Sequence, residues 1–513
     1  MSKTILGVTG TALAVCLVLD SPAMAGPADN SLVWAGPKEV AAVETYYDTS
    51  REAVILSQHV YDGLIYWDEE NEEFLPLLAT SFRQLDPVTW EFDLRDDVTF
   101  HDGSTFGPED VIYTFTFVTG DDSGILNSSD VRWFKSAEQT GEHTVTLTLT
   151  EPFPALLSNL ALVLPILPDG HYDAAEEGAD GQKRYAAVPP NGTGPYTVAD
   201  FAQGETVTMV KNPDYFADGP KGQPEIDTLV YRTIADSSTQ VAELMTGGVD
   251  WIWGLGNDQT AGLSGAPGIT TLNAPTMRIS YITFDIKGTS GTNVFTDAAV
   301  RQAIGYAVNR ERIATYLMGE NSVVVNAACH PVQFGCTADV ATYAYDPDKA
   351  RAQLAEAGYP DGFSVEFYGY RDRPVTEAIM DDLAKVGITA NLRWMKYAAL
   401  RDLIVKGEVP IANMTWGSNS IPDVSAITSY FFGGGSDDPA NDPEVQAAIR
   451  EGDSAADPDA RLAAYEQALR RIAEEAYWIP LFTYTKNYAF NETLEFVPTA
   501  DEIPKFFASS WKQ

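Results

Sequence analysis

The chain has 513 residues, of which 45% are hydrophobic and 11% aromatic, and it contains 10 tryptophans. This length exceeds what one compact core holds, so we expect two or three lobes, and the apolar content excludes intrinsic disorder. The formal net charge of −40 repels phosphate backbones and anionic lipid surfaces, which excludes nucleic acid as a partner.

The first 25 residues have the features of an export signal. Lys3 precedes an apolar stretch that ends at Leu19, and Ala23-x-Ala25 offers small residues for cleavage. The apolar stretch is shorter than the roughly 18 to 20 residues that a membrane span needs, so we expect a removed signal and not an anchor. A lipoprotein alternative uses Cys16, but the valine before it does not fit the small residue usually found there. We therefore expect a soluble, exported chain that begins at Gly26.

The first half of the mature sequence predicts mixed strands and helices. Alternating apolar and polar residues indicate half-buried strands, and apolar residues at helical spacing indicate helices. The Pro- and Gly-rich stretch 189–201 marks a domain boundary. We expect strands at residues 31–36, 89–103, 143–154, 206–212 and 228–234, and helices at 50–61, 107–118 and 237–253.

The second half alternates helices with strands, which is typical of βαβ units on a mostly parallel sheet. At the end, residues 460–490 predict a long helix followed by a strand that returns to an earlier lobe. Lobes linked by several strands can hinge. We expect helices at residues 297–319, 346–359 and 375–387, and strands at 363–370 and 388–395.

Two cysteines remain in the mature chain, Cys329 and Cys336 in "CHPVQFGC". In an exported chain, cysteines this close together indicate a disulfide that closes a short loop. A metal site that uses His330 is the alternative, but it needs a further ligand nearby, and the five histidines are scattered along the chain.

Motifs for catalysis are absent from the sequence. There is no Gly-x-Ser-x-Gly elbow, no His-Glu-x-x-His, no phosphate loop and no calcium loop. "GGGSDD" at 433–438 lacks the lysine of a phosphate loop and is interpreted as a turn. His101 lies beside an acid, as a catalytic base does, but we favour a structural hydrogen bond there. The absence of motifs weakens the interpretation as an enzyme.

Five segments, in order, resemble the signature segments of the family 5 extracellular solute-binding proteins, which are the dipeptide- and oligopeptide-binding receptors of bacterial ABC importers. The resemblance covers essentially the whole mature chain, and the order of the motifs adds to its specificity. The segments are residues 75–115, "NGTGPYTV" (191–198), "KNPDYF" (211–216), "VRQAIGYAVNRERI" (300–313) and "YDPDKARAQLAEAGY" (345–359).

This resemblance implies an α/β, three-domain fold of the periplasmic binding protein kind, with two main lobes hinged around a ligand cleft. Domain I comprises residues 26–70, 190–278 and 484–513, the inserted domain II residues 71–189, and domain III residues 279–483. The ligand lies between domains I and III, and a membrane permease recognises the closed form. Binding is then a shift of population from open to closed.

The resemblance also places Trp416 in the ligand cleft. In dipeptide-binding relatives, a Trp at this place is followed three residues later by an Asp that pairs with the ligand's α-amino group. Here that position is Asn419, whose amide accepts a hydrogen bond but supplies no charge. Asp423 is an alternative partner for the amino group. Trp416 is either a wall of the cleft or a core ring.

The same relatives use an Arg before a helix to bind the ligand carboxylate. Arg373 matches it by spacing, with Arg371 nearby, and the alternative for Arg373 is a surface arginine. Trp251 and Trp253 follow a Gly-Val-Asp that lies by the cleft in the family, so we expect a core role for one and a cleft role for the other. Further candidates in the first cleft loop are Tyr46 and Tyr47.

We therefore expect a periplasmic receptor for a peptide or peptide-like solute, with permease subunits of an ABC importer as partners. A sugar, opine or other polar solute is the alternative ligand, and a secreted hydrolase is the alternative from another class. No cofactor and no metal are expected, and nickel is disfavoured by the scattered histidines. The protein is expected to be a monomer.

Overall fold

The computed structural model describes residues 26–127, 131–179, 181–455 and 457–512. The predicted signal, residues 1–25, lies outside the described residues, as does the side chain of Asn419. Within the described part of the chain, no helix has both the length and the apolar composition needed to cross a membrane.

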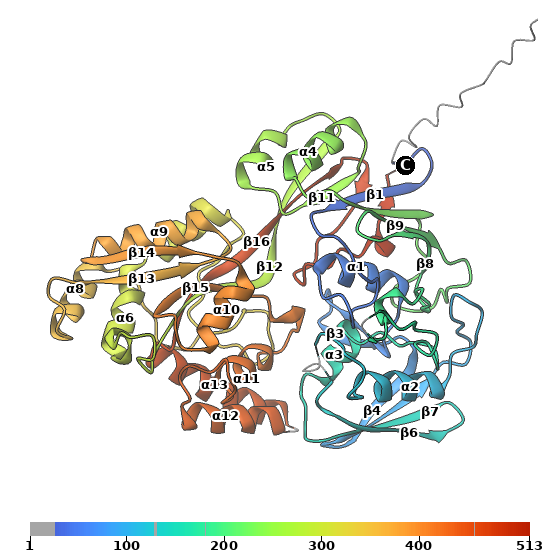
Figure 1. Cartoon of the computed structure of the whole chain (residues 1–513), viewed down its shortest axis with the longest axis horizontal. Coiled ribbons are helices and arrows are strands. Elements are labelled where there is room, and N and C mark those ends of the chain that lie inside the picture. The colour runs from blue at the N-terminus through green and yellow to red at the C-terminus, as the bar shows by residue number, and fades with distance from the viewer. Residues whose placement is uncertain (1–25, 128–130, 180, 456, 513) are drawn as a thin grey trace, which may run out of the picture.

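Two lobes with separate hydrophobic cores make up the molecule (Figure 1). The first lobe contains a large core from residues 32–274 and 488–507 and a smaller one beside it. The second lobe contains two neighbouring cores from residues 279–484. The chain therefore begins in the first lobe, forms the whole second lobe, and returns to the first.

One ten-stranded sheet runs through both lobes. β13 (Phe363–Gly369) pairs in parallel with β14 (Ile388–Trp394) and β15 (Ile411–Trp416), as βαβ units predict. In contrast, β12 (Ile269–Phe284) is antiparallel to both of its neighbours, β15 and β16 (Trp478–Asn491). The sheet is therefore mixed and not mostly parallel, because β12 leaves the first lobe and β16 returns to it in the opposite direction. The strand order is β14 (Ile388–Trp394), β13 (Phe363–Gly369), β15 (Ile411–Trp416), β12 (Ile269–Phe284), β16 (Trp478–Asn491), β11 (Trp251–Trp253), β1 (Ser31–Gly36), β10 (Thr228–Thr233), β9 (Thr206–Lys211) and β8 (Tyr196–Ala202).

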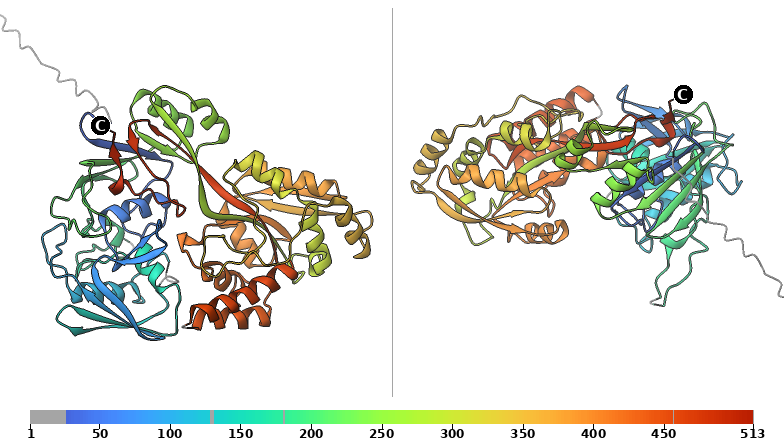
Figure 2. Two further views of the ribbon diagram at one scale, coloured as in Figure 1. Left: turned by 180° about the vertical axis from the view of Figure 1, so that it is seen from behind. Right: turned by 90° about the horizontal axis from the view of Figure 1, so that it is seen from above.

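The long strands β12 and β16 connect the lobes (Figures 1 and 2). Their pairing is regular in the first lobe up to Pro275 and resumes in the second lobe at Ile279, with a register shift between these residues. A proline cannot donate a ladder hydrogen bond, and an irregularity of this kind bends a strand. The crossing is therefore the place where the two lobes can hinge.

Smaller sheets complete the first lobe. An antiparallel sheet has the order β4 (Ala79–Asp86), β5 (Thr89–Leu94), β7 (Thr144–Leu149), β6 (Phe134–Gly141), and the short pairs are β2 (Ile65–Asp68) with β3 (Glu73–Pro76) and β17 (Leu494–Glu495) with β18 (Ser510–Trp511). The first-lobe helices are α1 (Arg51–Val60), α2 (Pro108–Val118), α3 (Leu156–Leu162), α4 (Ser237–Thr246) and α5 (Asn257–Leu263).

Helices cover the part of the sheet that lies in the second lobe (Figure 1). They are α6 (Ala298–Ala307), α7 (Arg310–Ile313), α8 (Pro347–Glu356), α9 (Arg373–Ala384), α10 (Tyr397–Val405), α11 (Ser425–Phe432), α12 (Pro443–Ser454) and α13 (Pro458–Glu474).

Several predicted elements are shorter than expected, among them the strand predicted at 143–154, which ends at Leu149. The helix predicted at 297–319 is interrupted because Val308 is extended and Asn309 caps a new helix, α7. The helix predicted at 237–253 ends at Thr246, since Gly247 adopts a left-handed φ of 77° that stops a helix, and β11 follows. The strand predicted at 89–103 ends at Leu94.

Candidate ligand-binding cleft

A cavity of about 630 Å³ lies where β12 and β16 cross between the lobes. Residues of the first lobe, the hinge strands and the second lobe all line it, so closure of the lobes changes its shape. The lining residues are 254–259, Arg278, 316–318, Arg371, Asp372, Pro374, Val375, 484–487 and Glu502.

Three basic side chains surround the carboxylate of Glu502 at this cavity. Glu502 Oε1 lies 3.2 Å from Lys486 Nζ, and Oε2 lies 3.3 Å from Arg278 Nη2 and 4.0 Å from Arg51 Nη2. Arg371 lines the same cavity. We call Arg51, Arg278, Arg371 and Lys486 the cationic cluster.

The balance of charged residues in the cleft differs from that of the whole chain, where 73 acidic residues outnumber 33 basic ones. The cationic cluster faces Glu502 and Asp372, which lies 3.9 Å from the Arg371 Nε, while Asp258 is exposed at the rim. Three basic side chains, Arg278, Arg371 and Lys486, and three carboxylates line the cavity, so the excess of acidic residues in the whole chain is absent here.

Burial of this network perturbs its protonation equilibria. Burial alone would raise the pKa of Glu502, but the four cations, Lys486 foremost, hold it well below its usual value. Burial and the neighbouring arginines lower the pKa of Lys486, although Glu502 opposes this. Cations that are short of compensating charge stabilise an anionic ligand by direct hydrogen bonds.

Local structure holds Glu502 in place. It adopts a left-handed φ of 61°, and the preceding Asp501 accepts hydrogen bonds from Thr499 Oγ1 and the Ile503 backbone N–H. Ala500 in the same segment accepts a hydrogen bond from the backbone N–H of Met277 in β12. The C-terminal segment of the first lobe is thus attached to the hinge strand itself.

The two arginines predicted from the sequence, Arg371 and Arg373, lie in different surroundings. Arg371 lines the cavity, with a side chain that is 36% exposed. Arg373 lies at the start of α9, is 59% exposed, and pairs with Glu377 at 2.7 Å. Arg373, favoured by spacing, is therefore a surface residue outside the cavity, and Arg371 is the one of the two that lines it.

The tryptophans of β11 lie at different depths. Trp251 is fully buried in the first-lobe core, where its ring packs against those of Trp34, Tyr488 and Phe506. Trp253 is 6% exposed, and Lys486 Nζ lies 4.6 Å from its ring centroid. Both rings thus belong to the first-lobe core and neither lines the hinge cavity, so the cleft role expected for one of them stays a prediction.

Tyr46 and Tyr47 pack away from the hinge cavity. The hydroxyl of Tyr46, a buried residue, donates to the backbone oxygen of Pro165, and that of Tyr47 donates to the backbone oxygen of Ser123. Tyr46 also lines a separate cavity of about 100 Å³ that contains Arg51. Both tyrosines thus connect the segment between β1 and α1 to residues later in the first lobe.

The segment 415–425, which we call the cleft segment, follows β15 in the second lobe. Trp416 is half-buried, stacks on Tyr430 with ring centroids 5.1 Å apart, and donates its indole N–H to the Ala426 oxygen. Asp423 pairs with Arg461 at 2.7 Å, and its side chain is 9% exposed. The Asp423 carboxylate is thus paired within its own lobe, and Asp423 does not line the hinge cavity. Asn419 lies in a 3₁₀ turn between Ser418 and Ser420.

Ser420 connects the cleft segment to the other lobe. Its hydroxyl accepts a hydrogen bond from Arg51 Nη1 at 3.0 Å and donates one to the Asp501 oxygen at 2.6 Å. Ser418 and Ser420 both adopt left-handed φ angles, 54° and 65°, which are costly for residues other than glycine. A strained turn therefore spans the two lobes beside the cationic cluster.

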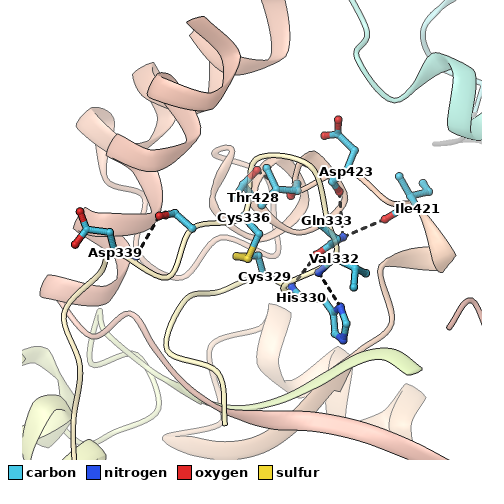
Figure 3. The surroundings of a disulfide bond; sticks show 11 residues. Cys329, His330, Val332, Gln333, Cys336, Asp339, Ile421, Asp423 and Thr428 are labelled. Atoms are coloured by element: carbon cyan, nitrogen blue, oxygen red, sulfur yellow. Dashed lines mark hydrogen bonds between the residues drawn. A yellow bond between two sulfur atoms is a disulfide. The ribbon is translucent and has the colours of Figure 1, made fainter. Parts of the chain in front are cut away.

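The disulfide between Cys329 and Cys336 supports this turn from behind (Figure 3). Within the loop that it closes, the Gln333 amide donates to the backbone oxygens of Ile421 and Asp423 at 3.0 and 3.1 Å. Phe334 adds backbone hydrogen bonds with Pro422 and Val424. The predicted disulfide is thus formed, and its loop fixes the backbone of the cleft segment.

Four residues of the site are absent from the sequence-based candidates: Arg51, Arg278, Lys486 and Glu502. Two of them could be identified from the sequence, because Arg278 and Lys486 are each the single cation of a long, mostly buried strand. Charged residues in such positions are rare unless they are paired. Glu502 lies in an irregular segment and carries no such signal.

No histidine or cysteine is among the described residues that line the hinge cavity. Likewise, no three His, Cys, Asp or Glu side chains of the described ranges are grouped as metal ligands. The ring of His101 donates a hydrogen bond from Nε2 to the Gly194 oxygen at 2.9 Å, away from this cavity.

Two lobes joined by two crossing strands, with a charged cavity at the crossing, define a hinged ligand-binding protein. The chain belongs to the bacterial extracellular solute-binding proteins of family 5. The family model described as "Bacterial extracellular solute-binding proteins, family 5 Middle" matches residues 73–438. The chain is therefore a solute-binding protein of the ABC importer class and not an enzyme.

Comparisons with known proteins agree with this family. The chain is 26% identical over 455 residues to heme-binding protein A of Haemophilus influenzae, covering 83% of this chain and 82% of the relative. It is 25% identical over 461 residues to the glutathione-binding protein GsiB of Salmonella typhi, covering 85% of each. A dipeptide-binding protein from Pseudoalteromonas sp. SM9913, in complex with Met-Leu, has the same fold, with a TM-score of 0.79, 21% identity, and coverage of 94% of this chain and 100% of that one.

Proposed function

We propose that this protein is a periplasmic receptor that binds a peptide or peptide-like solute with two or more carboxylates and delivers it to the permease of an ABC importer. The observation that carries the proposal is the cationic cluster in the hinge cavity. Arg278, Arg371 and Lys486 line that cavity, and Arg51 lies 4.0 Å from Glu502 beside it, in a chain with a net charge of −40. The exported form begins at Gly26 and acts as a monomer.

The size of the cavity agrees with a small ligand. A volume of about 630 Å³ is within the range of pockets that enclose small molecules. Arginine side chains bind carboxylates through two parallel hydrogen bonds, and Arg278 comes from the hinge strand β12 whereas Arg371 comes from the second lobe. A solute with carboxylates at two places can therefore hold the hinge strand and the second lobe together.

Closure follows from such contacts. A ligand shifts the population towards the closed form only through interactions that the closed form makes better. The contacts of Ser420 with Arg51 and Asp501 join the lobes next to the cationic cluster. An anion bound to Arg51 and Arg278 adds to the same junction, so binding and closure favour each other.

The relatives support a peptide-like ligand, since two of them are named for glutathione and for a dipeptide. Asn419, at the place where dipeptide-binding relatives have an acid, agrees with a ligand whose recognition depends on its negative charges more than on an ammonium group. Opines also carry carboxylates and are the second candidate, favoured by the same cations. A neutral sugar uses none of them.

A thermal-shift screen of residues 26–513 tests the proposal, because a ligand bound only by the folded protein raises its melting temperature. The panel contains neutral and acidic dipeptides and tripeptides, opines and oligosaccharides. We expect the acidic peptides to raise the melting temperature and neutral oligosaccharides to leave it unchanged. A shift with an oligosaccharide and none with any acidic compound rules out the proposed ligand class.

A further inference from the structure

Two carboxyl groups of the first lobe lie close together beside the segment that carries Glu502. Glu69 lies in the turn between β2 and β3, and its Oε1 accepts a hydrogen bond from the Ala500 backbone N–H at 2.6 Å. Asp501 follows Ala500 directly and is 3% exposed. We call residues 499–503 the tether segment, and Glu69 with Asp501 the acidic pair.

Each member of the acidic pair has one oxygen that forms no hydrogen bond. Glu69 Oε2 and Asp501 Oδ2 are both buried, and neither has a hydrogen-bond partner within the described part of the chain. Two neighbouring carboxylates in a buried site repel each other, and a proton on either of them removes one of the two charges. The surroundings of the pair therefore favour one bound proton.

Charged and titratable groups from each neighbouring element act on the acidic pair. Lys505 supplies one positive charge, and its Nζ lies 5.0 Å from the centroid of the Tyr66 ring in β2. Glu502 keeps its own charge, because the cationic cluster holds its pKa well below its usual value. Further charged or titratable groups nearby are Asp68 of β2, Tyr488 of β16, Arg51 of α1 and Lys221. The charge of Lys505 balances only one of the two carboxylates, so the pair has an excess negative charge when both are ionised.

This excess is visible in the protonation of Glu69. Burial, and after it the neighbouring Asp501, raises the pKa of Glu69 from 4.5 to about 7, while Lys505 and hydrogen bonds from the 500–501 backbone oppose the rise. Glu69 therefore holds its proton below pH 7 and releases it above.

The tether segment connects the acidic pair to the hinge and to the second lobe. The Ala500 oxygen accepts a hydrogen bond from the Met277 N–H of β12 at 2.7 Å. The Asp501 oxygen accepts one from the Ser420 hydroxyl of the second lobe at 2.6 Å. A change of charge on the pair thus acts on a segment whose backbone bonds to the hinge strand and to the opposite lobe.

We propose that Glu69 and Asp501 form a proton-operated switch that links the pH of the surroundings to the opening of the two lobes. With a proton on the pair, the tether segment stays in place and its backbone holds Ser420. When the proton leaves to solvent, two like charges lie in one buried site, and the tether segment lowers their repulsion by moving away from Glu69. The contact with Ser420 is then weakened, and the open form gains population without any ligand.

Small-angle scattering of the ligand-free residues 26–513 from pH 5 to pH 9 tests the switch. We expect the radius of gyration to rise with pH, with a midpoint near pH 7. Glu69→Gln replaces the carboxyl by a neutral amide of similar shape, so its radius of gyration should stay at the low-pH value of the wild type. Ser420→Ala removes the contact through which the switch acts, so this variant should lose most of the rise.

Glu44→Gln is the matched control. Glu44 is another buried carboxyl of the first lobe, and burial raises its pKa to about 8, but it accepts hydrogen bonds from the backbones of Tyr46 and Tyr47 and not from the tether segment. This variant should keep the rise and its midpoint near pH 7.

The wild-type titration decides by itself, since it involves no substitution. A radius of gyration that stays constant from pH 5 to pH 9 overturns the inference. A rise that survives in full in Glu69→Gln or in Ser420→Ala also overturns it, because the opening then has another cause. Either result leaves the proposed function in place, since the switch concerns the ligand-free protein.

Discussion

The substitution Glu502→Gln tests how strongly the hinge depends on its buried charges. The variant keeps the shape of the side chain but removes the carboxylate that lies 3.2 Å from Lys486 and 3.3 Å from Arg278. The cations are then left without their main compensating charge. They are also held in place by their own strands and cannot move fully into water.

The expected cost follows from burial. Removing one partner of a fully buried ion pair costs about 3 to 5 kcal/mol. The side chain of Glu502 is 8% exposed, whereas those of Arg278, Lys486 and Arg51 are 16%, 18% and 25% exposed, so water reduces the cost. We expect a loss of about 2 to 3 kcal/mol. For a chain of this length, that loss lowers the melting temperature by about 2 to 3 °C.

Differential scanning calorimetry at pH 7 and low salt measures this change. Glu377→Gln is the control, because it removes an acid whose pair with Arg373 is exposed on both sides, and such pairs contribute less than about 1 kcal/mol. A melting temperature of Glu502→Gln equal to that of the wild type, or a loss no larger than in the control, refutes the view that Glu502 holds the cluster together.

Three further predictions concern other parts of the molecule. Cys336→Ser opens the loop that fixes the cleft segment, so the affinity for the peptide Ala-Glu-Glu, measured by calorimetric titration, should fall severalfold. An unchanged affinity would show that the loop does not support the ligand-binding site. Ser420→Ala removes two hydrogen bonds between the lobes, worth about 1 kcal/mol each, so the unliganded protein should be more open by small-angle scattering, and an identical scattering profile contradicts this. Burial raises the pKa of Glu44 from 4.5 to about 8, so the folded state keeps a proton that the unfolded chain releases, and stability should fall as the pH rises from 5 to 8. Glu44→Gln should flatten this slope by up to about 1.4 kcal/mol per pH unit, and equal slopes refute the assignment.

The elements that the sequence predicts well are those with local signals. Helix α8 begins at a Pro after the capping Asp346, and β13 alternates buried residues with half-buried ones, so pattern and capping rules predict both. No helix is predicted at α10, α11 or α12, although Asp442 caps the last of them in the same way. The antiparallel pairing of β12 with β16 joins residues about 200 positions apart and has no local signal.

The site was partly predictable for the same reason. The resemblance to a family predicts Trp416 and Arg371 as site residues, and each of them lines a cavity between the lobes. Arg373 is the residue that fits the spacing of the family's arginine, but a helix start directs it to solvent, where it pairs with Glu377. Glu502 meets its cations only after the C-terminal segment folds back onto the hinge, so spacing in the sequence does not show it.

The most direct test of the central claim is calorimetric titration of residues 26–513 with Ala-Glu-Glu and Ala-Gln-Gln, repeated with Arg278→Gln. The cationic cluster predicts that the wild type binds Ala-Glu-Glu at least about tenfold more tightly than Ala-Gln-Gln, and that Arg278→Gln removes most of this difference. Equal affinity for the two peptides, or a difference that Arg278→Gln leaves intact, contradicts the claim that the hinge cavity recognises its solute by negative charge.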